Sequence, residues 1–138
     1  MESIARWVGG LKFEATFSTG HAIAMDTSVE QGGANEGPRP VELLLAGLAG
    51  CTGMDVLAIL CKKRQDVKSF QVRVLGERRD EHPKMFTKIH VIYEVTGSGI
   101  DVEGVKQAVL LSEGKYCSVA AMLRPAAPIT SEVRVTEV

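Results

Sequence analysis

Apolar and polar residues alternate in several short stretches of the chain, which is the pattern of strands with one buried face. The alternation covers residues 11–17, 21–25, 70–74, 89–95 and 129–135. Turn residues at Gly9-Gly10 and at Ser18-Thr19-Gly20 flank the first stretches, so they predict a small antiparallel sheet near the N-terminus. A charged connection, residues 77–84, joins the two middle stretches and predicts a second hairpin. The last stretch closes the chain as a strand.

A long helix is predicted between Pro40 and Lys63, with a length of about 36 Å at 1.5 Å per residue. Pro40 suits the first turn of a helix, and Glu42 suits its positively polarised start. Residues 43–54 carry no charge, and their apolar side chains go all round the helix instead of following one stripe. Such a helix must be surrounded by other parts of the protein. We expect the apolar face of the second hairpin to pack on it.

Three glycines recur every third residue inside this helix, at Gly47, Gly50 and Gly53. Each costs about 1 kcal/mol relative to alanine within a helix. The expected compensation is a seam without side chains, along which another backbone comes close. Cys51 lies beside this seam, one turn after Gly47, in the middle of the uncharged segment. Its thiol is therefore the best candidate for chemistry in the chain.

The rest of the chain adds one long loop and two shorter helices. Residues 26–39 are polar, contain glycine and have no periodicity, which is typical of a mobile or functional loop. Asp101 suits the N-cap of a second helix, and Gly114 is a plausible end for it. Cys117 is expected at the start of a short third helix that ends before Pro125. The length fits a single domain, residues 1–138.

Composition excludes several classes of function. Sixteen basic and seventeen acidic residues leave the chain near neutrality without a block rich in lysine or arginine, so we expect no nucleic-acid partner. The N-terminus has no basic segment followed by an apolar run, so no secretory signal is expected. The uncharged run of the helix, 12 residues, is expected to be too short to span a bilayer. The sequence thus predicts a soluble, cytoplasmic protein with no membrane partner.

Three cysteines in such a compartment favour buried thiols, a metal site or redox work over a disulfide framework. Cys51 and Cys61 lie about 15 Å apart along one helix, far beyond the 4.4–6.8 Å that a disulfide allows between Cα atoms. Cys117 is the only possible intrachain partner for either. Exposed amides at a helix N-terminus would favour the thiolate of Cys117, whereas Cys51 needs another positive group. The alternative for each thiol is a small buried apolar side chain, and Cys61 matters least.

No metal or cofactor site is predicted from motif spacing. The cysteines and His21, His82 and His90 never fall into paired ligand spacing, so the histidines are expected to be solvated or hydrogen-bonded. The glycines of the long loop do not follow a strand in a dinucleotide-binding pattern. Metal binding by the cysteines stays open as an alternative, which a chelator would test.

Two motifs carry a resemblance to a known family. The segment G-P-x-P-x-E-L-L-x-x-x-x-x-x-C, from Gly37 to Cys51, and the K-Y-C-S-V run around Cys117 resemble the OsmC/Ohr family of osmotically inducible and organic hydroperoxide resistance proteins. The sequence is most similar to the YhfA-like branch, over nearly the whole chain. The resemblance implies an α+β fold and an intertwined homodimer, in which the long central helices are buried between antiparallel sheets.

In the peroxidase members of this family, the first cysteine attacks the hydroperoxide and becomes a sulfenic acid. The second cysteine condenses with it to a disulfide, which a dithiol reductant such as a lipoyl group then reduces. Carried over by motif, Cys51 resembles the peroxidatic residue and Cys117 the resolving one. The resemblance therefore implies a thiol-dependent redox protein that reduces small organic hydroperoxides, with no bound cofactor.

This sequence departs from the peroxidases at two positions. They carry a glutamate directly after the motif proline and an arginine from the first hairpin or the loop, whereas Val41 and Leu11 stand here. Arg39 and Glu42 could rebuild the activating pair, or they could only cap the helix. The alternative function is a non-catalytic protein that binds an apolar small molecule in the dimer crevice beside Cys51.

Overall fold

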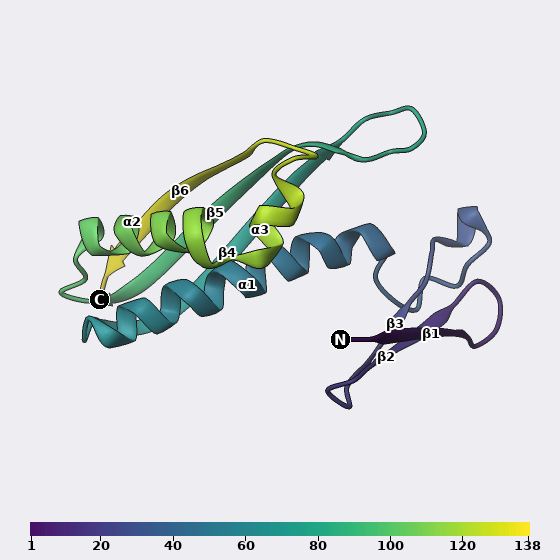
Figure 1. Cartoon of the computed structure of the whole chain (residues 1–138), viewed down its shortest axis with the longest axis horizontal. Helices are drawn as coiled ribbons and strands as arrows, with labels where there is room; N and C mark the ends of the chain where they lie inside the picture. The colour runs from purple at the N-terminus through teal and green to yellow at the C-terminus, as the bar shows by residue number, and fades with distance from the viewer. The chain divides into compact units, whose positions relative to one another are not determined.

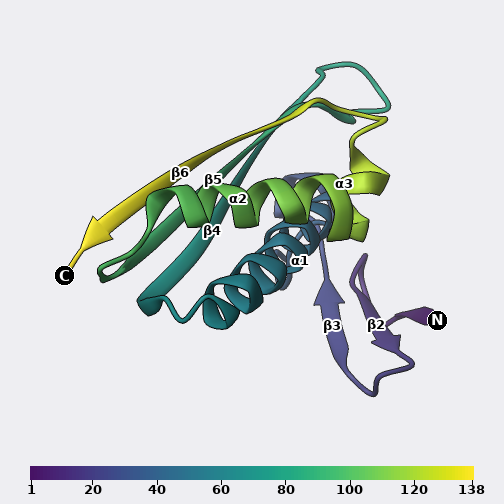
Figure 2. The same ribbon diagram turned by 60° about the vertical axis from the view of Figure 1, so that its left-hand side comes forward.

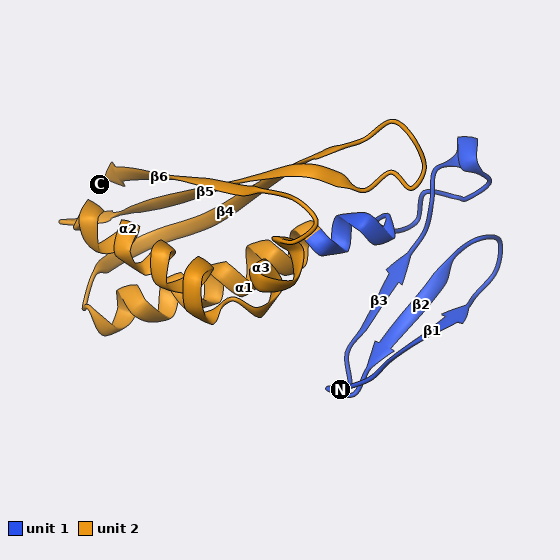
Figure 3. Cartoon of the chain, turned by 45° about the horizontal axis from the view of Figure 1, so that its top comes forward, with its two compact units in different colours: residues 1–44 blue, residues 45–138 orange.

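The computed structural model describes all 138 residues and divides the chain into two compact units, residues 1–44 and 45–138 (Figure 3). Secondary structure is mixed, so the predicted α+β class is confirmed. The prediction of one domain over residues 1–138 stays a prediction. The thiols predicted to react both belong to the second unit, whereas the long loop belongs to the first.

The first unit begins with a three-stranded antiparallel sheet in the order β1-β2-β3. Its strands are β1 (Ser3–Trp7), β2 (Phe13–Phe17) and β3 (Ala22–Met25). Gly9, Gly10 and Gly20 take positive φ angles of 114°, 54° and 89° in the two connecting turns. Glycine adopts this region without a steric penalty, which is why the turns fall at these positions. The predicted N-terminal sheet is confirmed.

Asp26 organises the long loop that follows β3. Its carboxylate accepts backbone N–H bonds from Thr27 at 2.7 Å, Glu36 at 3.0 Å and Ala34 at 3.2 Å. These bonds lower the pKa of Asp26 below its ordinary value, and the bond from Glu36 has the largest effect. Apart from a 3₁₀ turn at Val29–Gln31, residues 26–39 form no helix or strand, as predicted. The Asp26 side chain thus stabilises a loop that has no regular backbone hydrogen bonding of its own.

Helix α1 (Pro40–Lys62) ends within one residue of its predicted boundary. Two residues beyond its end, Arg64 takes a left-handed φ of 56°. The fully buried residues follow one stripe four residues apart: Leu48, Thr52, Val56 and Leu60. A single chain therefore covers only part of α1, and the expectation that the helix is surrounded stays a prediction. By length and composition alone, α1 is long and apolar enough to cross a membrane. The expectation that its apolar part is too short to span a bilayer is therefore wrong. Core helices of soluble proteins also meet this criterion.

The second unit is a three-stranded sheet with helices on one face (Figures 1 and 2). Strands β4 (Asp66–Arg78) and β5 (Phe86–Ser98) form the predicted antiparallel hairpin, and β6 (Ile129–Glu137) pairs with β5 in parallel. A parallel neighbour requires a crossover connection. It consists of α2 (Val102–Leu111), a π-helical turn (Ser112–Tyr116) and α3 (Ser118–Leu123). The predicted helix end at Gly114 is wrong, because the π-helical turn runs through it.

Apolar side chains of β4 pack on α1, as the alternation predicted. A Cβ added at Gly53 would lie 3.3 Å from Val72 and 4.0 Å from Phe70. Gly47 faces a side chain of α3, and Gly50 faces open space. The three glycines therefore meet side chains or nothing, and the predicted close approach of a second backbone is not made within this chain.

Candidate functional site

Helix α1 places a thiol and a carboxylate one turn apart. Residues four positions apart lie on the same face of an α-helix, and Cys51 and Asp55 have this spacing. Cys51 is half-buried with a free thiol. Helical geometry alone therefore brings these two side chains side by side.

The crossover brings the second thiol to the same place. Cys117 is the N-cap of α3, where its Sγ accepts a hydrogen bond from the backbone N–H of Ala120 at 3.3 Å. Its own backbone N–H donates to the carbonyl of Ser112 at 2.7 Å, which closes the π-helical turn. The predicted position of Cys117 at the start of a third helix is confirmed. Hydrogen bonds to the main chain thus hold both the Sγ atom and the backbone N–H of Cys117.

Cys51, Asp55 and Cys117 form one cluster in the second unit. The two Sγ atoms and a carboxylate oxygen of Asp55 all lie within 4.8 Å of one another. Both cysteines are free thiols in this structure. A disulfide needs a sulfur–sulfur distance of about 2.0 Å, so a small movement separates this arrangement from a bond. The exposed Cys61 lies outside the cluster, as expected.

Burial keeps the Cys117 thiol protonated. Only 3% of the residue is exposed, and this desolvation raises the pKa of Cys117 to about 11. The N–H of Ala120 opposes the shift, and the neighbouring Cys51 adds to it. The amides of Ala120 and Val119 at the start of α3 lower the pKa of Cys117, as expected of a helix N-terminus, but the loss of water outweighs them and the net shift is upward. Deprotonation of Cys117 needs a proton acceptor close by.

A buried serine orients the Asp55 carboxylate. The hydroxyl of Ser112, itself fully buried, donates to Oδ2 of Asp55 at 2.8 Å. Ser112 is the first residue of the π-helical turn whose end carries Cys117. One turn of backbone therefore positions both the second thiol and the carboxylate that faces it.

Behind the cluster lies a buried phenol. The hydroxyl of Tyr93, on β5, donates to Oε1 of Glu113 at 2.8 Å, and burial raises the pKa of Tyr93. Thr52, next to Cys51 in the sequence, buries an Oγ1 that has no hydrogen-bond partner. Its interaction with the Tyr93 phenol influences the pKa of Tyr93 but falls short of hydrogen-bond geometry. Sequence patterns singled out none of these three residues.

Arg39 and Glu42, the predicted activating pair, lie in the first unit and form no ion pair there. Glu42 Oε1 accepts from the backbone N–H of Arg39 at 2.9 Å, which satisfies one amide at the start of α1. The guanidinium of Arg39 donates to Asn35 Oδ1 at 2.9 Å and to the carbonyl of Gly37 at 3.1 Å. Both side chains thus have structural partners. Their catalytic role stays a prediction.

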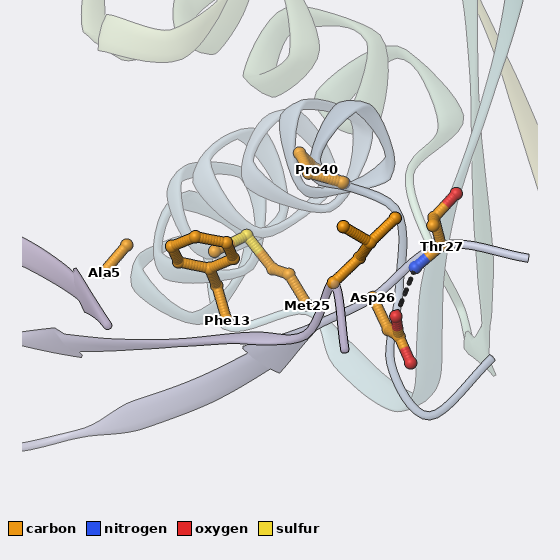
Figure 4. Close-up of a pocket in the computed structure, with 7 residues that line it drawn as sticks. Ala5, Phe13, Met25, Asp26, Thr27 and Pro40 are labelled. Carbon is orange, nitrogen blue, oxygen red and sulfur yellow. Dashed lines mark hydrogen bonds between the residues drawn. The ribbon is translucent and has the colours of Figure 1, made fainter. Parts of the chain in front are cut away.

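The first unit also contains an apolar cavity of about 200 Å³. Its lining comprises Ala5, Leu11, Phe13, Met25, Asp26, Thr27 and Pro40. Phe13 and Met25 are paired across β2 and β3, and their side chains point toward one another in Figure 4. The backbone N–H of Thr27 donates to Oδ1 of Asp26 at the edge of the group drawn in Figure 4. Leu11, from the turn between β1 and β2, adds to the apolar lining.

Two thiols and one carboxylate, which can together bind a metal such as zinc, meet in the thiol cluster. Sequence spacing missed this set, because its members come from two helices far apart along the chain. The histidines do not contribute to it. His21 contacts Thr19 at 3.1 Å, and His90 contacts Thr130 at 2.7 Å and Glu132 at 2.9 Å. These two are hydrogen-bonded, as expected.

Known proteins share the sequence and the fold. A model of the OsmC-like protein family matches residues 33–132. Protein YhfA of Escherichia coli is 41% identical over 135 residues, or 98% of each chain. A hypothetical protein from Aquifex aeolicus, solved by crystallography, gives a TM-score of 0.87 at 33% identity and covers 99% of this chain and 96% of its own. An organic hydroperoxide resistance protein OsmC from Legionella pneumophila gives 0.65 at 17% identity, over 99% and 97%, a likeness of fold alone.

Proposed function

We propose that this chain, which belongs to the OsmC-like protein family, is a thiol-dependent redox protein that reduces small organic hydroperoxides. The observation that carries the proposal is the meeting of Cys51 and Cys117 as free thiols within 4.8 Å. Neither thiol pairs in sequence spacing, so the fold has brought them together. The name of the Legionella pneumophila structure, an organic hydroperoxide resistance protein, supports the choice of oxidant.

The proposed reaction has two steps with balanced atoms. The sulfur of Cys51 attacks the distal oxygen of the hydroperoxide, so that an S–O bond forms, the O–O bond breaks and an alcohol leaves with the thiol proton. The sulfur of Cys117 then attacks the sulfenic sulfur, so that the disulfide forms and water leaves. A dithiol of the cell would restore both thiols. The half-buried Cys51 is the more accessible sulfur, which fits the first role.

Reaction with a stoichiometric alkyl hydroperoxide tests this function. Cumene hydroperoxide should lower the thiol titre from three to one per chain, and peptide mass mapping should join Cys51 to Cys117. The matched control is Cys61→Ser, which should still lose two thiols. Replacement of Cys51 by serine should abolish peroxide consumption. If Cys51 stays a free thiol in the treated wild-type protein, the proposed function is refuted.

A homodimer is proposed as the working assembly, in the cytoplasm. Helix α1 supports this proposal, because Met54 is 76% exposed, Leu57 is 39% exposed and Gly50 faces open space. A second copy packed on this face would remove apolar surface from water at roughly 25 cal/mol per Å². Light scattering should give twice the chain mass, and Met54→Asp should shift the protein toward the monomer. A monomeric wild-type protein at micromolar concentration would end this proposal.

A second function is favoured by the apolar cavity of the first unit. A volume of about 200 Å³, bounded by Phe13, Met25 and Leu11, suits a small apolar molecule. A non-catalytic protein would bind such a molecule whether or not Cys51 is present. Titration with a fluorescent apolar probe should then give the same affinity for wild type and Cys51→Ser. Loss of binding in Phe13→Asp would assign the probe to this cavity, and unchanged binding would exclude it.

A further inference from the structure

The charged side chain that the structure places against both sulfurs is acidic. Asp55 has a carboxylate oxygen within 4.8 Å of each Sγ atom, and Ser112 holds its Oδ2 at 2.8 Å. An ion pair with a cation would stabilise a resting thiolate, whereas a neighbouring carboxylate disfavours one. Asp55 therefore cannot take the role that an arginine has in activating a thiol. What a carboxylate can do at this distance is accept a proton.

Cys117 is the residue that requires a proton acceptor. Its thiol is buried and its pKa is raised from 9.0 to about 11, so less of it is ionised at neutral pH than of an ordinary cysteine. A sulfenic acid on Cys51 would wait for this thiol to lose its proton. Asp55 lies within reach of both sulfurs, and its orientation is fixed from the buried side by Ser112. The carboxylate is thus placed to serve each sulfur in turn.

We propose that Asp55 is the proton carrier of the thiol cluster, an inference that rests on the proposed hydroperoxide reduction. In the first step Asp55 takes the proton from the Cys51 thiol as the S–O bond forms, and gives it to the alkoxide released when the O–O bond breaks. In the second step Asp55 takes the proton from Cys117 as the disulfide forms, and gives it to the hydroxide that leaves the sulfenic sulfur. Asp55 thus passes on each proton that it takes and is unchanged at the end of each step.

The Ser112 hydroxyl distinguishes this role from chance proximity. A carboxylate that only neighbours two thiols would turn toward solvent, where its charge is best hydrated. Instead, a fully buried hydroxyl from the turn that ends in Cys117 anchors Asp55. General acid–base groups placed within reach of the proton contribute about 10²–10⁴ in rate. Removal of the carboxylate should therefore slow the reaction strongly, and it should do so by slowing the steps that transfer a proton.

The test uses the full-length protein with Cys61→Ser as background, because this exposed thiol would otherwise react with the probes. Asp55→Asn keeps the shape and can still accept from Ser112, but cannot carry a proton at neutral pH. It should slow consumption of cumene hydroperoxide about a hundredfold. Alkylation of Cys51 by iodoacetamide should stay equal or become faster, because removal of the negative charge favours the thiolate. Asp55→Glu should recover part of the rate.

The matched control is Asp66→Asn, which removes an exposed carboxylate of the same unit that pairs with Lys68. It should behave as the background in both assays. If Asp55→Asn consumes hydroperoxide within threefold of the background, or loses alkylation in the same proportion, Asp55 is not a proton carrier. If the background itself consumes no hydroperoxide, the proposed function fails and the inference fails with it.

A measurement on the unsubstituted cluster covers the case in which Asp55→Asn does not fold. Disulfide formation in the background protein can be followed in H₂O and D₂O after a single addition of hydroperoxide. A transferred proton should slow this step about twofold or more in D₂O, at matched positions on the pH profile. Equal rates in the two solvents would overturn the inference without any substitution at Asp55.

Discussion

Thr52 offers a direct test of the packing behind the thiol cluster. Its side chain is fully buried, and its Oγ1 has no hydrogen-bond partner. A buried hydroxyl without a partner costs about 1–3 kcal/mol. Thr52→Val replaces this hydroxyl by a methyl group of similar shape, and the helix propensities of the two residues are nearly equal. We therefore expect the substitution to stabilise the protein by about 1–2 kcal/mol.

Urea denaturation followed by far-ultraviolet circular dichroism measures this effect. With a slope of about 2 kcal/mol per M, the midpoint should rise by about 0.5–1 M. Protein concentration must be equal in all samples, because association would add to the apparent stability. Thr136→Val, at an exposed position of β6, is the control and should change stability by less than about 0.5 kcal/mol.

The refuting result is a loss of stability in Thr52→Val. It would mean that the hydroxyl has a partner, and the Tyr93 phenol is the group that faces it. A double-mutant cycle with Tyr93→Phe separates the two cases. A coupling free energy near zero agrees with the unpartnered hydroxyl, whereas coupling of about 1 kcal/mol would show a bond between the two side chains.

Two further predictions concern pH. Asp26→Asn should lower the thermal midpoint at pH 7 and increase proteolysis of residues 26–39, because three backbone N–H groups lose a charged acceptor. Since the folded pKa of Asp26 is lowered, its contribution is present above the unfolded value of about 3.9 and is lost as the pH falls through the folded value. A deficit of Asp26→Asn that did not shrink as the pH fell below about 3.9 would contradict this. The pKa of Cys117 is raised from 9.0 to about 11, so its contribution is full below pH 9 and is lost as the pH rises toward 11. Urea midpoints should therefore fall less between pH 8 and 10.5 in Cys117→Ala than in wild type, and parallel falls would contradict the shift.

The sequence predicted the elements better than their contacts. Alternation located every strand except β1, and Pro40 with the lysines near residue 63 located α1 within one residue. These signals are local, because they depend on which face of a short segment is buried. Gly114 misled the prediction of the second helix, because glycine is also accepted within a π-helical turn. The missed π-helical turn matters for the proposed function, because it contains Ser112 and is followed directly by Cys117.

The two cysteines of the candidate site were predicted from the sequence, but the polar residues around them were not. Cys51 and Cys117 were expected together from a family resemblance, and the structure places them together. Asp55 could have been found, since it follows Cys51 by four positions on a predicted helix. Its bond to Ser112 joins residues 57 positions apart, and no pattern in the chain indicates such a pair. The carboxylate of Asp55 beside the thiols was therefore not anticipated, and the expected role of Arg39 and Glu42 stays a prediction.

The meeting of the two thiols follows from the direction of the last strand. Because β6 runs parallel to β5, the chain must return across a face of the sheet between Ser98 and Ile129. The helices of that return lie on the face that α1 also covers (Figures 1 and 2). Had β6 been antiparallel, a short hairpin would have sufficed, and no helix would bring Cys117 to Cys51. Period-two alternation is the same in both cases, so the property on which the proposed chemistry depends is topological.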